Sequence, residues 1–290
     1  MKYLFLSVLF FATTISAMAQ GPLKLPALSP NAKISQDFSL SSIEIAYSRP
    51  SMRGRKVFGD IVPFNKVWRT GANAATKIKI GEDLEIGGQK VKAGEYALYT
   101  IPGKDKWEII LNNGTGNWGA DGYNTDADVA RFSVKTSMID GICQTFTINI
   151  TDITFSTCKI EMMWERTKVV IPVTAHNEER VDKSIDEAIN KPSIPYFQAA
   201  SYYYETNQNL DKAKMYVDKA LETNDKAFFM WYLKARIEKK LGNKDAAIAA
   251  AQKSIDAAKG SAFEGEYKHN NEKIINELKK GTHKVELEDN

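Results

Sequence analysis

The chain has 290 residues, which is enough for about two domains of ordinary size. Hydrophobic residues make up 43% of it and charged residues 26%, the composition of an ordinary soluble globular protein. Lys and Arg total 39 against 36 Asp and Glu, and this nearly even balance argues against general nucleic-acid binding. We therefore expect no nucleic-acid partner.

The first 19 residues have the pattern of a cleavable signal peptide. Lys2 supplies the positive charge, residues 3–12 are an apolar run too short to span a bilayer, and Ala17 to Ala19 form a small-x-small cleavage site. We expect a periplasmic or secreted protein that starts at Gln20, with an N-terminal extension over residues 20–32. A membrane anchor is the alternative, but small and hydroxyl residues interrupt the apolar run. No later segment has 18 consecutive apolar residues, so no transmembrane segment is predicted.

Residues 33–175 predict an all-β domain. Short segments of β-type residues recur at near-regular spacing, and turn dipeptides such as Gly87-Gly88 separate them. No helical period lies between these segments, which predicts an all-β sandwich or barrel-like domain. The predicted strands cover residues 76–80, 84–86, 95–101, 107–111, 146–150, 160–164 and 169–173.

The two cysteines, Cys143 and Cys158, flank a predicted hairpin centred on Ile150 and Thr151. An exported protein can form disulfides, but residues opposite each other in a hairpin must share a face. Cys143 alternates with polar residues and Cys158 with apolar ones. We therefore expect two unpaired cysteines, with a disulfide as the less favoured alternative.

The stretch from residue 47 to residue 73 is unusually rich in arginine. Its guanidinium groups could gather planar donors for a carboxylate, phosphate or sulfate, and Trp68 could add an apolar wall for a sugar or a peptide. In the alternative, the arginines tie long loops to carbonyl oxygens and to Asp partners. The predicted ligand-binding residues are Arg49, Arg53, Arg55, Trp68, Arg69 and Asn73.

A set of short motifs recurs through residues 30–174: Tyr47–Ser51, Arg53–Arg55, Val67–Asn73, Ala93–Tyr96, Ile101–Pro102 and Trp118–Gly119. These motifs resemble those of a secreted family that is abundant in Bacteroidetes and catalogued only as a domain of unknown function. The resemblance implies residence in the cell envelope and a β-rich domain, and it implies no reaction.

A long polar loop covers residues 112–128. Asn124, Asp126 and Asp128 stand at alternate positions, as the ligands of a calcium loop do. However, Val129 and Lys135 occupy the places where that loop needs Gly and Glu, so no metal site is predicted. We expect a solvated loop that caps the arginine-rich region, in which carboxylates could pair with the arginines. Those carboxylates are Asp121, Asp126 and Asp128.

The histidines limit the chemistry of the β domain. All three lie at or beyond its end, at His176, His269 and His283, which excludes a Ser-His-Asp or Cys-His mechanism and a His-ligated zinc site within it. No phosphate-binding Gly-rich loop and no dinucleotide motif is present, so no cofactor is predicted. A hydrolase of envelope polymers remains an alternative function, with paired carboxylates. Its candidate residues are Asp60, Asp121, Asp126 and Asp128.

The C-terminal part of the sequence predicts helices. Residues 176–191 predict an amphipathic connecting helix, and a 34-residue period follows, in which Asn209 recurs as Asn243 and Ala213 as Ala247. Residues 193–259 resemble tetratricopeptide repeats. We predict tetratricopeptide-like repeats with a capping helix over residues 192–280 and a tail over 281–290. An unrelated helical bundle is the alternative.

The repeat resemblance places a set of residues on the concave face, where such repeats commonly hold extended peptides. Gln198 lies there, and the predicted partner-binding residues are Tyr202, Tyr232, Arg236 and Lys239. The Lys/Asn clamp that some tetratricopeptide proteins use for a terminal carboxylate is absent from the sequence. Packing of this face on the β domain is the alternative. The favoured function is an exported binding or assembly protein, and a purely structural role for the arginines is also considered.

Overall fold

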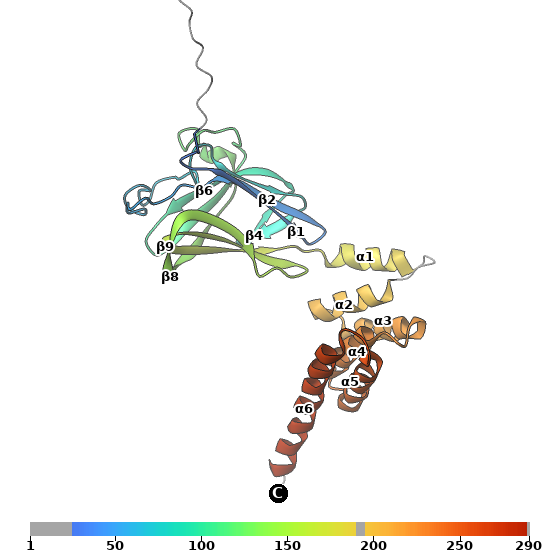
Figure 1. Cartoon of the computed structure of the whole chain (residues 1–290). Coiled ribbons are helices and arrows are strands. Elements are labelled where there is room, and N and C mark those ends of the chain that lie inside the picture. Colours follow the sequence, from blue (N-terminus) through green and yellow to red (C-terminus); the bar gives the residue numbers. More distant parts are fainter. Residues whose placement is uncertain (1–24, 190–194, 289–290) are drawn as a thin grey trace, which may run out of the picture.

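The computed structural model describes residues 25–189 and 195–288 (Figure 1). An antiparallel β domain is followed by helices, as the sequence predicts. The expected signal peptide lies outside the described residues. None of the helices in the described residues is both long enough and apolar enough to cross a bilayer.

The strands form one antiparallel sheet in the order β1-β2-β3-β6-β7-β8-β9-β4-β5. Figure 1 shows β1, β2 and β6 in one layer and β4, β8 and β9 in the layer that faces it. The strands are β1 (Asn31–Phe38), β2 (Ser41–Ser48), β3 (Thr76–Ile80), β4 (Leu84–Ile86), β5 (Gln89–Val91), β6 (Gly94–Pro102), β7 (Lys106–Asn112), β8 (Asp128–Thr151) and β9 (Thr157–Thr174).

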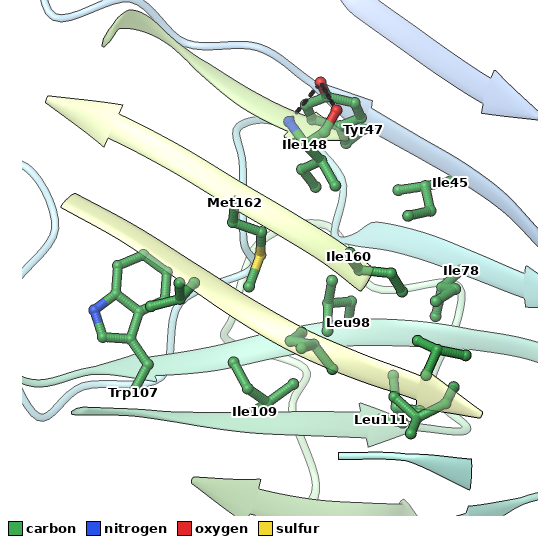
Figure 2. Close-up of a cluster of buried hydrophobic side chains, with 14 of the residues drawn as sticks. Ile45, Tyr47, Ile78, Leu98, Trp107, Ile109, Leu111, Ile148, Ile160 and Met162 are labelled. Atoms are coloured by element: carbon green, nitrogen blue, oxygen red, sulfur yellow. Dashed lines mark hydrogen bonds between the residues drawn. The ribbon is translucent and has the colours of Figure 1, made fainter. Parts of the chain in front are cut away.

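The core between the layers follows from the period-two alternation of the strands. Ile43 and Ile45 on β2, for example, are 0% exposed, while the residues between and beside them are partly exposed. Figure 2 shows the inward-facing side chains interdigitating. Tyr47 links the layers, because its hydroxyl accepts a hydrogen bond from the Ile148 amide at 2.9 Å and donates to the Ile148 carbonyl at 3.3 Å.

Strand β8 is much longer than the predicted segment 146–150. Its first third pairs with β7 and the rest with β9, so this one strand connects the two layers. The part that pairs with β7 was not predicted because only Ala130 is fully buried there, while Phe132 and Val134 are half-buried and the other side chains are polar or exposed. The sequence therefore carries little alternation in this part of the strand.

Strand β9 merges two predicted strands into one. Its inward positions are even-numbered up to Trp164 and odd-numbered from Val169 onward. Glu165 lies between them with φ of 57°, and the β8–β9 register shifts nearby. A bulge of this kind adds a residue and so changes which face the following side chains take.

The β8–β9 hairpin turns later than predicted. Thr151 pairs with Lys159, so the turn falls around residues 152–156 and not at Ile150 and Thr151. A local cluster fixes the turn, in which the Thr154 hydroxyl accepts a hydrogen bond from the Thr157 amide at 2.9 Å. Asp152 enters the turn with φ of 50°.

The helices are α1 (Glu178–Ile189), α2 (Tyr196–Thr206), α3 (Leu210–Thr223), α4 (Phe228–Lys240), α5 (Lys244–Ala258) and α6 (Glu264–Glu288). Pairs α2–α3 and α4–α5 form helical hairpins, and α6 packs on α5 and α4. Ala213 and Ala247, one period apart, are both 0% exposed, because small residues let neighbouring helices approach closely. Buried Asn271 of α6 donates to the Ser254 hydroxyl of α5 at 2.9 Å, which joins the predicted capping helix to the last hairpin.

Polar contacts connect the β domain to the first helices. The Asn177 amide donates to the Ser39 hydroxyl at 2.8 Å and to the Phe155 carbonyl at 3.0 Å. Arg180 of α1 pairs with Glu82, whose side chain is only 8% exposed. Tyr202 of α2 meets Phe155 edge to face, with 5.8 Å between the ring centroids.

Candidate functional site

A groove in the helical half is the first candidate site. It is a cavity of about 480 Å³ lined by side chains of α2, α4 and α6. Four of its residues carry positive charge and one carries negative charge. The lining residues are Tyr204, Tyr232, Arg236, Lys239, Lys240, Asn270, Lys273, Ile274 and Glu277. We call this cavity the α4–α6 groove.

Arg236 is the central side chain of the α4–α6 groove. Its guanidinium carbon lies 4.5 Å from the centroid of the Tyr204 ring and 5.5 Å from that of Tyr232. Glu205 pairs with it at 3.3 Å. Stacking on two rings fixes the plane of the guanidinium while leaving several of its five donors for a partner.

The lysines of the groove differ in their contacts. Lys239 pairs with Glu277, and the hydrogen bond from Lys239 lowers the pKa of the Glu277 carboxyl, which stays ionised. Lys240 donates to the Tyr204 carbonyl at 3.2 Å and lies 4.2 Å from the Tyr204 ring. Lys273 on α6 adds a further positive charge, and its field also lowers the pKa of Glu277. The groove is thus basic, with an aromatic wall.

Of the four predicted partner-binding residues, Tyr232, Arg236 and Lys239 line this groove together. Tyr202 does not: it is 7% exposed, contacts Phe155, and its hydroxyl lies 3.5 Å from the Asn177 amide oxygen. Its place is the junction with the β domain, where the alternative interpretation puts it. Tyr204 was not among the predicted partner-binding residues, although it lies two residues after Tyr202 on the same helix.

The arginine-rich stretch of the β domain is the second candidate site, and three of its arginines donate to neighbouring protein atoms. Arg49 donates to the Phe146 carbonyl at 3.1 Å and to the Thr147 hydroxyl at 2.8 Å. Arg53 donates to the Leu28 carbonyl at 2.9 Å. Arg55 donates to the carbonyl oxygens of Met52 and Ser51 at 3.0 and 3.2 Å. Through these hydrogen bonds the three guanidinium groups hold loops in place. A ligand role for them stays a prediction.

Trp68 lies in the interior, at 7% exposure, where a sugar or peptide does not reach it. It packs among four other aromatic rings, with centroid distances of 5.0 to 6.2 Å. Its indole N–H donates to the Gly71 carbonyl at 3.0 Å, which holds the following turn. The surrounding rings are Phe58, Trp107, Phe146 and Trp164.

The turn after Trp68 is tightly built. Thr70 and Asn73 both have positive φ, 54° and 61°, and a Cβ added at Gly71 would lie 3.0 Å from the Ser48 carbonyl oxygen. Thr70 is 0% exposed, and its carbonyl accepts from the Thr76 hydroxyl at 2.6 Å. Asn73 donates to the Ser48 hydroxyl at 3.2 Å. The turn therefore serves chiefly to start β3 beside the end of β2.

Arg69 differs from the other three arginines. Its Nε atom is buried and has no hydrogen-bond partner, and no hydrogen bond of its side chain is found within the described residues. Burial lowers the pKa of the Arg69 guanidinium, and the charge of Asp121 partly opposes this. A half-buried donor without an acceptor is costly, which makes Arg69 the member of the predicted set that most needs a partner.

In the polar loop over residues 112–128, the Asp128 carboxylate is held by neighbouring side chains. Asp128 accepts hydrogen bonds from Tyr123 at 2.8 Å, from Asn112 at 2.7 Å and from Arg131 at 2.9 Å. The Asn124 side chain accepts from the Asp126 amide at 3.0 Å. Within the described residues, no group of three or more His, Cys, Asp and Glu side chains is placed to hold a metal ion.

The other candidate carboxylates of the hydrolase alternative are all exposed. They are Asp60, Asp121 and Asp126, the last within a short 3-10 helix over Thr125–Ala127. The hydrolase alternative thus gains no support from the geometry.

Both cysteines are free, as the parity argument predicts. Cys143 lies opposite Glu165, in the irregular part of the β8–β9 pairing, and its thiol contacts the Thr145 carbonyl at 3.1 Å. Cys158 faces the core at 2% exposure. Burial raises the pKa of the Cys158 thiol to about 12, so this thiol is inert at neutral pH.

The fold and the groove together define a two-part protein with a protein-interaction module: an antiparallel β domain followed by tetratricopeptide-like hairpins. Residues 230–260, which cover most of α4 and all of α5, match the tetratricopeptide repeat. Residues 29–173 match the family described as a protein of unknown function (DUF2911), and the chain belongs to this family. No curated protein and no solved structure matches the chain.

Proposed function

We propose that this chain is an exported binding module that holds an acidic segment of a protein partner in the α4–α6 groove. The observation that carries the proposal is the pairing of an aromatic wall, Tyr204 and Tyr232, with four cationic side chains around one cavity. Opposite charge attracts an acidic segment and orients it, and the rings accept its apolar side chains. The tetratricopeptide match over α4 and α5 supports a protein partner.

A larger cavity, of about 530 Å³, lies between the β8–β9 turn and the end of α2. Among the described residues that line it, Glu205 alone is ionisable. It offers little to fix the orientation of a partner, since specific sites combine apolar walls with convergent polar groups. The α4–α6 groove is therefore the better docking site.

The binding experiment uses the full mature chain and a fluorescein-labelled peptide rich in Asp, Glu and Leu, followed by fluorescence anisotropy. Reversing the charge at Lys273 (K273E) should weaken binding about tenfold, because it places a carboxylate in the basic groove. Higher salt should weaken binding to the unchanged chain as well.

Lys268→Glu is the matched control, because Lys268 is exposed on the same helix and does not line the groove. It should bind the peptide as the unchanged chain does. An equal loss in both variants, or stronger binding of a Lys-for-Glu version of the peptide, would contradict the proposed function.

Export is tested separately. The signal-peptide pattern of residues 1–19 supports a periplasmic or secreted protein. Intact mass measurement of the chain recovered after expression in a bacterium should give a mature protein that begins at Gln20, found in the periplasmic or secreted fraction. Recovery of uncleaved chain from the cytoplasm would refute this part.

A further inference from the structure

The Arg69 side chain, whose buried Nε atom has no hydrogen-bond partner in the described part of the chain, lies on the outer face of the β domain. Side chains alternate along an extended segment, and Val67 belongs to an outer apolar cluster with Ala75 and Tyr99, whereas Trp68 points into the core. The side chain of Arg69 therefore faces the same side of the sheet as that of Val67. Tyr123, from the loop after β7, covers the same cluster. Arg69 is thus placed beside that loop.

The loop after β7 reaches back to the segment that follows Arg69. Trp118 forms a backbone bridge with Ala74, and the Ala75 amide donates to the Asn117 carbonyl at 3.2 Å. The Thr76 amide donates to the Arg69 carbonyl at 3.1 Å, so Arg69 lies next to the same stretch. Asp121 of the loop is close enough for its charge to act on Arg69. The chain segments that carry Arg69, Trp118 and Asp121 therefore lie together at one end of the sheet.

Trp118 is 75% exposed, which is unusual for the largest apolar side chain, and its loop is well fixed. The Asn117 amide donates to the Tyr99 hydroxyl at 3.0 Å and to the Gly122 carbonyl at 2.8 Å. The loop packs so closely around Asn117 that a Cβ at Gly122 would come within 2.6 Å of its amide oxygen. The indole is therefore presented to solvent by an anchored backbone.

We propose that Arg69, Trp118 and Asp121 form a binding site for a neutral saccharide. The C–H face of a sugar ring packs on an indole plane, and its vicinal hydroxyls both donate and accept hydrogen bonds. Asp121 supplies acceptors, and the guanidinium of Arg69 supplies donors. An inorganic anion would satisfy Arg69 but would be repelled by Asp121, and it would leave Trp118 unused. This site is independent of the α4–α6 groove; it retains Arg69 of the predicted ligand-binding set and takes Trp118 as the aromatic wall.

The test titrates the full mature chain with neutral trisaccharides of glucose (β-1,4 and α-1,4), mannose and N-acetylglucosamine. Acrylamide quenching of tryptophan fluorescence reports on the site, because Trp118 is the most exposed tryptophan: Trp68, Trp107 and Trp164 are buried, and Trp231 is only partly exposed. At least one sugar should protect the indole saturably at millimolar concentration. Trp118→Ala should remove the sugar-dependent protection, and calorimetry should show at least about tenfold weaker binding for Arg69→Gln and Asp121→Asn.

The matched controls are Met138→Ala, which removes an equally exposed apolar side chain at 76%, and Arg166→Gln, which removes an exposed arginine of the same domain. Both should bind as the unchanged chain does. Since Asp121 is exposed, Asp121→Asn keeps the test decisive even if Arg69→Gln folds poorly. Lack of protection by every sugar, binding that survives Trp118→Ala, or protection by inorganic sulfate or an acidic peptide alone would overturn the proposal.

Discussion

The β domain and the helical half both place arginine beside aromatic rings, but they use the two residue types differently. In the β domain, Arg49 ties a loop to the Phe146 carbonyl, and the rings near it are buried. In the helical half, Arg236 stacks on Tyr204 and Tyr232 at the edge of an open groove. Helices satisfy most of their own carbonyl groups, whereas long loops leave carbonyls that need side-chain donors. Arginine and aromatic residues therefore stabilise the fold in the β domain, whereas in the helical half they are available for binding.

The largest effect should come from removing the buried ring at the centre of the β domain. Trp68→Ala should lower the free energy of unfolding by about 3–5 kcal/mol, because it leaves a cavity among four rings. Denaturant unfolding, followed by near-ultraviolet circular dichroism, measures it. Trp118→Ala, at an exposed ring, should cost about 0.5 kcal/mol or less. Similar costs for the two variants would show that the core is not organised around Trp68.

A smaller effect should separate the arginines that tie loops. Arg49→Gln loses bonds to the Phe146 carbonyl and the Thr147 hydroxyl, both partly buried, and should cost about 1–2 kcal/mol. Arg53→Gln loses one exposed bond to the Leu28 carbonyl and should cost about 0.5 kcal/mol or less. Urea unfolding curves of equal slope give both losses in the free energy of unfolding from the shifts of their midpoints. Loss of stability in neither variant would mean that these arginines are not structural, and would strengthen their predicted ligand role.

The smallest effect is a pH dependence that belongs to the β domain. Burial raises the pKa of Cys158 from 9.0 to about 12, so the unfolded chain loses its thiol proton first as the pH rises. The contribution of Cys158 is complete below pH 9.0 and is lost as the pH rises toward 12. The loss of this contribution should lower the free energy of unfolding by about 1 kcal/mol near pH 10.

The free energy of unfolding, measured with urea between neutral pH and about pH 10, should lose this decrease with pH in Cys158→Ala. Cys143→Ala should keep the decrease. The two variants are matched in chemistry and differ in burial, because Cys143 is only half-buried. A slope that persists in Cys158→Ala must come from another group.

How far the sequence predicts this structure depends on how local each signal is. Tyr232, Arg236 and Lys239 follow helical spacing on α4, so the sequence alone assigns them to one face, and the structure has all three on the groove. Tyr204 and Lys273 join them from α2 and α6, and that meeting depends on how the helices pack. Local periodicity carries no information about it.

In the β domain the sequence identifies the class of fold but not the role of the arginine-rich stretch. The density of Arg, Trp and Gly in residues 47–73 is the same whether the side chains bind a ligand or fix a turn. Only the hydrogen-bond partners separate the two cases: Arg49, Arg53 and Arg55 have carbonyl acceptors within the chain, and Arg69 has none within the described residues. The exposure of Trp118 is not predictable from the sequence, because the residue lies in a polar loop without a periodic pattern that would indicate burial.

The positive φ of Glu165 has a consequence for how this domain tolerates length changes. Its carboxylate accepts from the Val57 amide at 3.3 Å, so the extra residue is held in place by a distant loop. Deleting Glu165 would shift the rest of the strand by one residue. Val169, Ile171 and Val173 would then face water, and their neighbours would face the core. Natural insertions and deletions in this family should therefore avoid the middle of β9 and collect in the loops around it.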